Sequence, residues 1–309
     1  MEAERFRFLI DEAGLRLFTD SKPDELNSAL ERLVEIIQEV RAHPIGKLSS
    51  VWEEQIGQHP LYDWLFDHTL GIDRDVAGAL QVALSRTPDW DTLWGTAGIS
   101  VEVAIGATKE VAFSVAAAAR ETRARRATAC LSPHLSRSGR LSVIAADGPT
   151  GVHFVCEPAH VRAFFRDVPE TEDLDEDGYF ENAPFAFPNL HFVRDRTRFN
   201  NFEERYETVR PRVTAHLAVL NDHAKAILCL PDGPAAKIGM FGSHGVEASG
   251  ESPKTRHDQD AMNQRDVHVD GEVVVCNWHT KIRRHLDRIY FNATSHDRVI
   301  IGVFHRHLD

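Results

Sequence analysis

The stretch NWHTKIRRHLDRIYFNATSHDRVIIGVFHRHLD, residues 277–309, alternates apolar side chains with an unusual density of basic ones. Between Trp278 and Leu308 it holds one lysine and five arginines against two aspartates, together with five histidines. The chain as a whole has a formal net charge of −12. Such a net charge argues against a protein that coats nucleic acid or anionic membrane with its whole surface, so the local reversal of sign indicates a patch for an anionic partner.

The alternation in this region has a period of two residues, which predicts a small antiparallel sheet. Three runs are typical of strands: 266–279, 287–293 and 297–308. In the second run, alternation puts Arg288 and Tyr290 on one face of the sheet. In the third run, one face receives the following side chains: Val299, Ile301, Val303, His305 and His307. This run is apolar on both faces in its middle, so we expect it to be a central strand.

The side chains gathered on this face suit the cleavage of RNA without a metal. Such cleavage needs a base for the 2′-hydroxyl, a cation beside the phosphate and an acid for the leaving oxygen, and histidine can fill both proton roles. The candidate catalytic residues are His279, Lys281, Arg288, His305 and His307. The candidate phosphate-binding residues are Arg306, Arg298, Arg256 and Lys254, the last two from the loop GESPKTRHDQD. The same face also suits a surface that only docks an acidic partner, including the chain's own acidic middle.

The order of these elements carries a resemblance to a known family. An apolar strand ends in Lys281, a strand Arg-Ile-Tyr-Phe comes next, and a strand Arg-Val-Ile-Ile-Gly-Val-Phe-His-Arg-His closes the series. This order resembles the closing strands of the RelE/ParE toxin superfamily, whose ribonuclease members cleave messenger RNA without a metal. The resemblance implies that Arg288 stabilises the phosphate, that Lys281 is the basic residue of the preceding strand and that 305–307 supply the acid and base. The whole chain looks like a multidomain bacterial toxin or antiphage-defence protein.

The rest of the chain predicts an α+β fold in three regions. Residues 1–95 are expected to be mainly helical, with SKPDELNSALERLVEIIQEVRAHP as a helix that starts at Pro23 and stops before Pro44. Residues 96–230 are expected to mix strands and helices, including strands in SVEVAIGA and EVAFSVAA and a hairpin around Asp147-Gly148. Residues 231–309 are expected to form the antiparallel domain that carries the basic, histidine-rich face.

An acidic stretch, 167–181, separates the first part of the middle region from the helices after it. Within it Asp173, Asp175, Asp177 and Gly178 match the first half of a calcium-binding loop, but Pro184 stands where the loop needs a bidentate glutamate. The alternative is a solvated acidic loop. The four cysteines are scattered singly, which disfavours a thiolate zinc site. His305, His307 and His279 could also converge on a metal, but no accompanying motif supports it, so we predict neither metal nor cofactor.

Three functions stay open at this point. The first is a metal-independent ribonuclease-like toxin or defence effector that acts on nucleic acid, with RNA preferred to DNA. The second is a non-catalytic module that binds phosphate, nucleic acid or an acidic protein. The third is a subunit of a larger bacterial complex that contacts a protein partner or another copy through the helical N-terminal region. No run of about 18 apolar residues and no secretory signal pattern is present, so we expect a cytoplasmic protein without a membrane partner.

Overall fold

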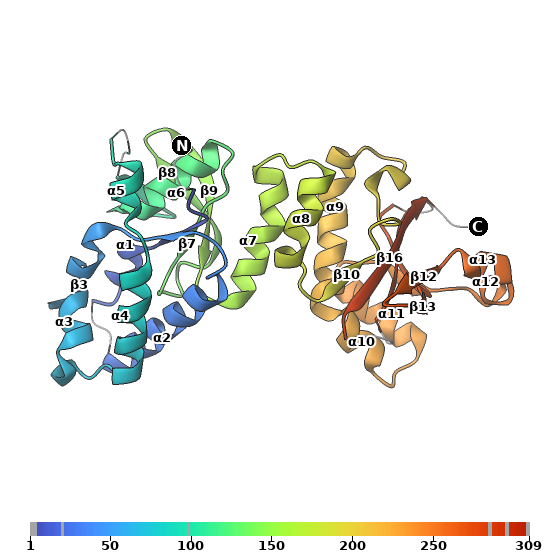
Figure 1. Ribbon diagram of the computed structural model, residues 1–309, viewed down its shortest axis with the longest axis horizontal. Coiled ribbons are helices and arrows are strands. Elements are labelled where there is room, and N and C mark those ends of the chain that lie inside the picture. The colour runs from blue at the N-terminus through green and yellow to red at the C-terminus, as the bar shows by residue number, and fades with distance from the viewer. Residues whose placement is uncertain are drawn as a thin grey trace. The chain divides into compact units, whose positions relative to one another are not determined.

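The computed structural model describes these parts of the chain: 5–19, 22–97, 99, 101–283, 286–293 and 297–306. They form an α+β fold made of two compact units, Met1–Asp173 and Leu174–Asp309 (Figure 1). The boundary between the units falls inside the acidic stretch that sequence analysis predicts as a separator. Two units replace the three expected regions, because two strands from region 1–95 join the sheet of the middle region and a strand at 190–192 joins the C-terminal sheet. No described helix is both long and apolar enough to cross a membrane.

The first unit contains a seven-stranded mixed sheet in the order β2-β1-β7-β9-β8-β5-β6. Its strands are β1 (Phe8–Ile10), β2 (Ile45–Gly46), β5 (Glu102–Ile105), β6 (Thr108–Val111), β7 (Ala129–Leu131), β8 (Gly139–Ala145) and β9 (Gly148–Val155). Its α-helices are α1 (Glu12–Leu15), α2 (Pro23–Glu39), α3 (Leu61–Phe66), α4 (Arg74–Arg86), α5 (Trp90–Trp94), α6 (Phe113–Arg123) and α7 (Pro158–Thr171). The hairpin of β3 (Gln55–Ile56) and β4 (His59–Pro60) and the short helices η1 (Ser49–Glu53) and η2 (His68–Leu70) complete it.

Strands β2, β1, β7 and β9 run parallel, and β8, β5 and β6 extend the sheet in antiparallel fashion. Helix α6 covers one face of the sheet through Val115 and the alanines 116–119, which are buried against side chains such as Leu9. The small alanine side chain permits close approach of helix and sheet, and alanine also favours the helix itself. The strand expected in EVAFSVAA is therefore wrong from Phe113 onward. On the other face Phe8 packs against Phe164 of α7, with ring centroids 5.2 Å apart.

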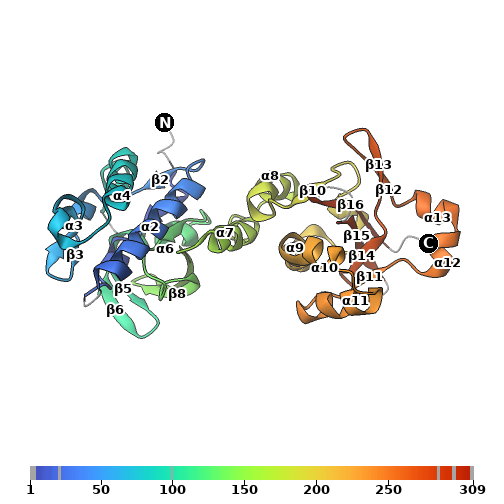
Figure 2. The same cartoon turned by 90° about the horizontal axis from the view of Figure 1, so that it is seen from below.

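The second unit contains a five-stranded sheet in the order β10-β16-β15-β14-β11, with a separate β12–β13 hairpin (orange, Figure 2). The strands are β10 (Leu190–Phe192), β11 (Ala248–Gly250), β12 (Asp266–Val269), β13 (Glu272–Val275), β14 (Trp278–Lys281), β15 (Asp287–Asn292) and β16 (Val299–Arg306). The helices are α8 (Glu176–Ala186), η3 (Phe199–Asn201), α9 (Tyr206–Val219), η4 (Leu220–Ala224), α10 (Lys225–Cys229), α11 (Pro234–Ser243), α12 (Pro253–His257) and α13 (Gln259–Asn263).

An antiparallel meander is confirmed as β14-β15-β16, but most of the predicted run 266–279 forms the separate β12–β13 hairpin instead of its first strand. Strand β16 is central, because β10 pairs with its other edge in parallel. One face of this sheet is covered by aromatic residues: the Phe304 ring lies 5.0 Å from Phe202 and 5.6 Å from Phe199, centroid to centroid. Valines of the β12–β13 hairpin cover part of the other face, around Tyr290. The sheet is thus buried on both sides in its middle, as the apolar centre of β16 predicts.

A bulge at Gly302 breaks the alternation expected along β16. Tyr290 pairs with Val303 and Phe291 with Ile301, which leaves Gly302 without a partner. As a result Ile300 and Val303 pack into the same apolar cluster, although simple alternation places them on opposite faces. The single face predicted for Val299, Ile301, Val303 and His305 is therefore wrong, because Val299 and Ile301 lie opposite Val303 and His305, and His307 lies outside the described residues.

Replacing Gly302 by alanine is expected to destabilise the second unit by about 1–3 kcal/mol, because the new methyl group overfills the core. A Cβ atom built there lies 2.3 Å from Cys276 Sγ and 3.2 Å from a Val267 methyl carbon. In a Cys276→Ala background the thiol is gone, and the same substitution should cost less than half as much. Urea denaturation followed by circular dichroism measures both costs. Equal costs in the two backgrounds would contradict this account of the bulge.

Candidate functional site

The register of the second sheet brings three of the predicted catalytic residues into one row. Lys281 of β14 pairs with Arg288 of β15, and Arg288 pairs with His305 of β16. Directly paired side chains on adjacent strands lie on the same face, about 5 Å apart at Cβ. We call Lys281, Arg288 and His305 the basic row. The fifth predicted catalytic residue, His307, lies outside the described residues.

Arg288, in the middle of the basic row, has no carboxylate partner among the described residues. Among the residues that the structure describes, it forms no ion pair, and its Nε is buried without a hydrogen-bond partner. The flanking Lys281 contacts the carboxylate of Glu247. The His305 side chain, which is partly exposed, contacts the backbone carbonyl of Arg306. Arg288 therefore has unused capacity to bind an anion, because guanidinium presents five donors in a fixed fork.

Other basic side chains of this region are neutralised by glutamates that sequence analysis did not connect to them. Arg283 lies 3.1 Å from Glu204, and Arg306 lies 3.4 Å from Glu203. The local excess of positive charge is thus partly balanced within the chain itself. Ion pairs between exposed groups are weak, however, so they can be exchanged for contacts with a phosphate.

His279 lies on the same face as the basic row, next to Tyr290, with ring centroids 5.3 Å apart. It is 5% exposed, so its imidazole is not open to a substrate in the way the sequence prediction requires. Its Nε2 lies 3.1 Å from Ser249 Oγ and its Nδ1 lies 3.3 Å from Glu251 Oε1. Sequence reasoning missed both partners, because the segment that holds them looks like a Gly- and Ser-rich linker.

The predicted phosphate-binding residues do not form one cluster in the described structure. Arg306 comes directly after His305 on β16 and therefore points to the opposite face of the sheet. Arg298 is exposed just before β16. Lys254 and Arg256 belong to α12, where Ser252 caps the helix through the Thr255 amide. The long loop expected there is wrong, because the segment folds into α12 and α13.

The acidic stretch is not arranged as a calcium loop. Asp175 caps α8 by accepting a hydrogen bond from the Gly178 amide at 2.9 Å. Asp173 instead pairs with Arg125 at 3.0 Å. In the part of the chain that the structure describes, no group of three or more histidine, cysteine or acidic side chains is placed to hold a metal ion. All four cysteines are free, and three of them are buried.

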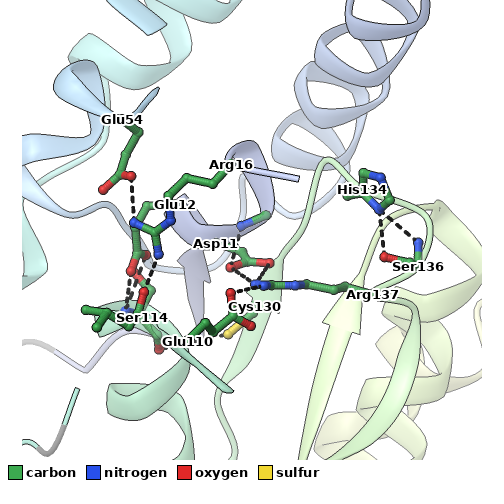
Figure 3. Close-up of polar contacts among 12 residues, drawn as sticks. Asp11, Glu12, Arg16, Glu54, Glu110, Ser114, Cys130, His134, Ser136 and Arg137 are labelled. Atoms are coloured by element: carbon green, nitrogen blue, oxygen red, sulfur yellow. Dashed lines mark hydrogen bonds and ion pairs between the residues drawn. The ribbon is translucent and has the colours of Figure 1, made fainter. Parts of the chain in front are cut away.

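The first unit holds a buried group of acids and arginines that sequence reasoning missed (Figure 3). Asp11 comes directly after β1, and its side chain accepts hydrogen bonds from Arg137 Nη1 at 2.8 and 3.1 Å. Arg137 also contacts Glu110. Burial alone lowers the pKa of a guanidinium, but the attraction of the Asp11 and Glu110 carboxylates outweighs burial and raises the pKa of Arg137. A buried arginine held by two carboxylates is a fixed structural charge.

Glu12, the next residue, is fully buried at the start of α1, and its carboxyl group accepts from the Ser114 amide at 3.2 and 3.3 Å (Figure 3). Burial, reinforced by the neighbouring Asp11 carboxylate, raises the pKa of Glu12 to about 7. The signal in the sequence is the pair Asp11-Glu12 immediately after the apolar run FLI. Parallel strands place their carboxyl-terminal ends at one edge of a sheet, which is where such sheets bind ligands.

A cavity of about 500 Å³ lies beside this edge, lined in part by Phe18, Arg32 and His134. Burial together with Arg137 and Arg32 lowers the pKa of His134, so its imidazole is neutral at pH 7. The cavity also receives the carboxylates of Asp24 and Glu25. Its lining mixes both signs of charge and points to no single ligand class.

Comparison of the chain with models of known protein families, with characterised proteins and with solved structures finds no match. Geometry and chemistry therefore carry the functional conclusion, and within them the basic row is the arrangement most specific for a ligand.

Proposed function

We propose that the protein acts on nucleic acid and that the basic row is its contact with the phosphate backbone. The observation that carries the proposal is Arg288, a cation without an ion-pair partner among the described residues, flanked on neighbouring strands by Lys281 and His305. Arginine binds phosphate through two parallel hydrogen bonds, and the adjacent lysine adds a mobile charge. The overall charge of −12 restricts such binding to a local surface.

The chemistry that the basic row supports is cleavage of a phosphodiester without a metal. Arg288 stabilises the negative charge that builds up on the phosphate, and the partly exposed imidazole of His305 transfers a proton. RNA is the first substrate to test, because its 2′-hydroxyl can serve as nucleophile. Cleavage of cellular or phage RNA is the activity that a toxin or an antiphage-defence effector requires.

Arg288→Gln is expected to weaken binding of a labelled single-stranded RNA about tenfold at about 0.15 M salt. It should also lower the slope of log affinity against log salt by about one, because one phosphate contact is lost. Fluorescence anisotropy at several salt concentrations measures both quantities. Arg306→Gln is the matched control, since Arg306 lies on the opposite face of the same strand pair and should change affinity less than twofold. Equal losses in the two variants would contradict a specific role for the basic row.

Cleavage is tested by incubating labelled single-stranded RNA and DNA with the protein, with and without EDTA. We expect RNA cleavage that survives EDTA and falls about 100-fold or more in His305→Ala, because a general acid or base contributes about that factor. Cleavage abolished by EDTA would overturn the metal-independent mechanism. Salt-sensitive binding without any cleavage would overturn the enzymatic part of the proposal and leave the binding part.

A second function is favoured by a different observation, the glutamate that already pairs with the basic row. Glu247 contacts Lys281, and Glu204 contacts Arg283 shortly after β14. A face that accepts carboxylates of its own chain can also accept those of another protein, so the alternative is a non-catalytic subunit that docks an acidic partner. Competition by a polyglutamate peptide, but not by RNA, for a fluorescent probe on this face is the result expected for that function.

A further inference from the structure

Ser249 and His279 face each other across the edge of the second sheet. β11 and β14 are antiparallel, and their register pairs these two residues directly. Ser249 Oγ lies 3.1 Å from His279 Nε2, within hydrogen-bond distance. Ser249 is partly exposed, while His279 is buried, so the hydroxyl is the outer atom of the pair. A serine that contacts the ring nitrogen of a buried histidine has the geometry of a nucleophile with its base.

Glu251, two residues after Ser249, occupies the other side of the imidazole. Its Oε1 lies 3.3 Å from His279 Nδ1, which is ion-pair distance although the angle is outside the range for a hydrogen bond. The same oxygen accepts a hydrogen bond from Arg265 Nε at 2.8 Å, and Arg265 is 1% exposed. Arg265 therefore fixes the position of the Glu251 carboxylate. A carboxylate at Nδ1 orients the imidazole and stabilises the imidazolium that forms when Nε2 takes a proton.

The surroundings keep this histidine neutral and ready to accept a proton. Burial lowers the pKa of His279, and the nearby charges of Arg288 and Lys281 act in the same direction against the opposing effect of Glu251. Burial disfavours the charged form of Glu251, but its interactions with His279 and Arg265 lower its pKa below the ordinary value. At pH 7 the arrangement is thus a neutral imidazole between a hydroxyl and a carboxylate.

We infer that Ser249 is a nucleophile, activated by His279 as base and Glu251 as positioning residue, and that it attacks phosphodiesters. The substrate class rests on the proposed function. Ser249 Oγ attacks the phosphorus while its proton passes to His279 Nε2. The bond from phosphorus to the leaving oxygen breaks, and that oxygen takes the proton from the imidazolium. Water, deprotonated by His279, then hydrolyses the phosphoserine diester, and the serine oxygen regains a proton.

A phosphodiester fits this site better than a neutral ester because of the charges beside it. His279 and Lys281 are two residues apart on β14, so their side chains share a face about 7 Å apart. Lys281 and Arg288 are paired on that face, Lys281 on the strand that pairs with β11 and Arg288 on the strand beyond it. The basic row would hold the phosphate chain and Ser249 would act on it. Because the nucleophile belongs to the protein, this route does not need a 2′-hydroxyl, and cleavage of DNA distinguishes it from attack by the 2′-hydroxyl of RNA.

The first experiment treats the full chain with diisopropyl fluorophosphate and locates the modified residue by mass spectrometry. Labelling is expected on Ser249 and should disappear in Ser249→Ala. In His279→Gln the labelling rate should fall about 100-fold or more, the contribution of a general base. Ser136→Ala is the matched control, because Ser136 Oγ also contacts a histidine, His134 Nδ1 at 2.7 Å, in the first unit. Labelling of Ser249 that is equally fast in His279→Gln would overturn the inference, as would no labelling of Ser249 in the wild-type protein.

Two further measurements test the role of Glu251 and the substrate class. The Glu251→Gln substitution keeps the shape of the side chain but removes its charge. Labelling of Ser249 should become slower, and the midpoint of the pH dependence of labelling should move to lower pH, because the His279 imidazolium loses a stabilising charge. An unchanged pH profile would overturn the positioning role. Bis(p-nitrophenyl) phosphate should be hydrolysed and p-nitrophenyl acetate should not; the reverse would overturn the phosphodiester class.

Failure of this inference and failure of the proposed function give different results. Loss of RNA affinity in Arg288→Gln tests the basic row, and loss of Ser249 labelling in His279→Gln tests the serine nucleophile, so the two measurements can fail independently. Cleavage of RNA with no cleavage of DNA, retained in Ser249→Ala, would overturn the serine nucleophile while supporting the basic row. Labelling of Ser249 without any nucleic-acid binding would overturn the proposed role of the basic row and the phosphodiester substrate class. Circular dichroism of each variant confirms that the fold is intact before these comparisons are made.

Discussion

Asp11→Ala is expected to lower the free energy of unfolding of the first unit by about 3–5 kcal/mol, the usual cost of leaving one member of a buried ion pair without its partner. The Asp11 side chain is fully buried and that of Arg137 is 5% exposed. Removal of Asp11 also removes the acceptor of the Gly14 amide at the start of α1. Glu110 remains on the other side of Arg137 and holds the loss below that of a completely unpaired charge.

Urea denaturation followed by tryptophan fluorescence measures this loss, since four of the five tryptophans, Trp52, Trp64, Trp90 and Trp94, lie in the first unit. Asp147→Ala is the matched control, because Asp147 pairs with Arg123 at 3.3 Å but is 76% exposed. It should change the free energy of unfolding by less than about 1 kcal/mol.

A double variant separates the lost pair from other effects of the substitution. Replacing Arg137 by methionine in the Asp11→Ala protein removes the uncompensated charge, and part of the stability should return. A loss for Asp11→Ala no larger than that for Asp147→Ala would show that the buried pair is not a structural support of this sheet edge.

Glu12 is expected to make the first unit less stable as pH rises from about 4.5 to about 7, by about 3 kcal/mol in total. The pKa of its carboxyl group is about 7 in the folded protein against an ordinary value of 4.5. Between these values the folded state holds a proton that the unfolded state has released. Stability therefore falls with rising pH across this window, and it does not fall further, on account of this group, above the folded pKa.

Glu12→Gln isolates this contribution, because a neutral amide of the same shape does not titrate. The difference in free energy of unfolding between wild type and variant should change by about 3 kcal/mol from about pH 4.5 to about pH 7.5, in favour of the variant at the higher pH. Other carboxylates titrate in both proteins and cancel in the difference. A difference that is flat over this range would mean that the Glu12 carboxyl group is ionised in the folded state throughout.

The parts of the fold that depend on neighbouring residues could be predicted from the sequence. Helix α2 begins at Pro23 as expected, because proline fixes the first turn. The hairpin of β8 and β9 turns at Asp147-Gly148, where glycine accepts a positive φ. Alternation, a local property of strands, also predicts that Arg288 and Tyr290 share a face, whereas the row of Lys281, Arg288 and His305 depends on the register between strands.

The parts that depend on distant partners could not be predicted in this way. Strand β1 has only three residues, and it is a strand because β2 and β7 pair with it. The need for glycine at 302 depends on the space that the Cys276 thiol occupies, which no local pattern encodes. The roles inferred for Ser249 and Glu251 depend on contact with His279, and this contact forms only when β14 pairs with β11.

The parallel pairing of β10 with β16 has a consequence for how quickly the second unit can form. Leu190 pairs with Val299, so about a hundred residues of chain must be in place before this pair of strands can meet. Closing so large a loop costs conformational entropy before any contact between the strands offsets that cost. Proteins rich in such pairings fold in milliseconds to seconds. During synthesis on the ribosome, β10 emerges many seconds before its partner, at typical rates of about 5–20 residues per second. Throughout that interval the aromatic residues Phe199 and Phe202 lack the cover that Phe304 of β16 gives them in the folded unit.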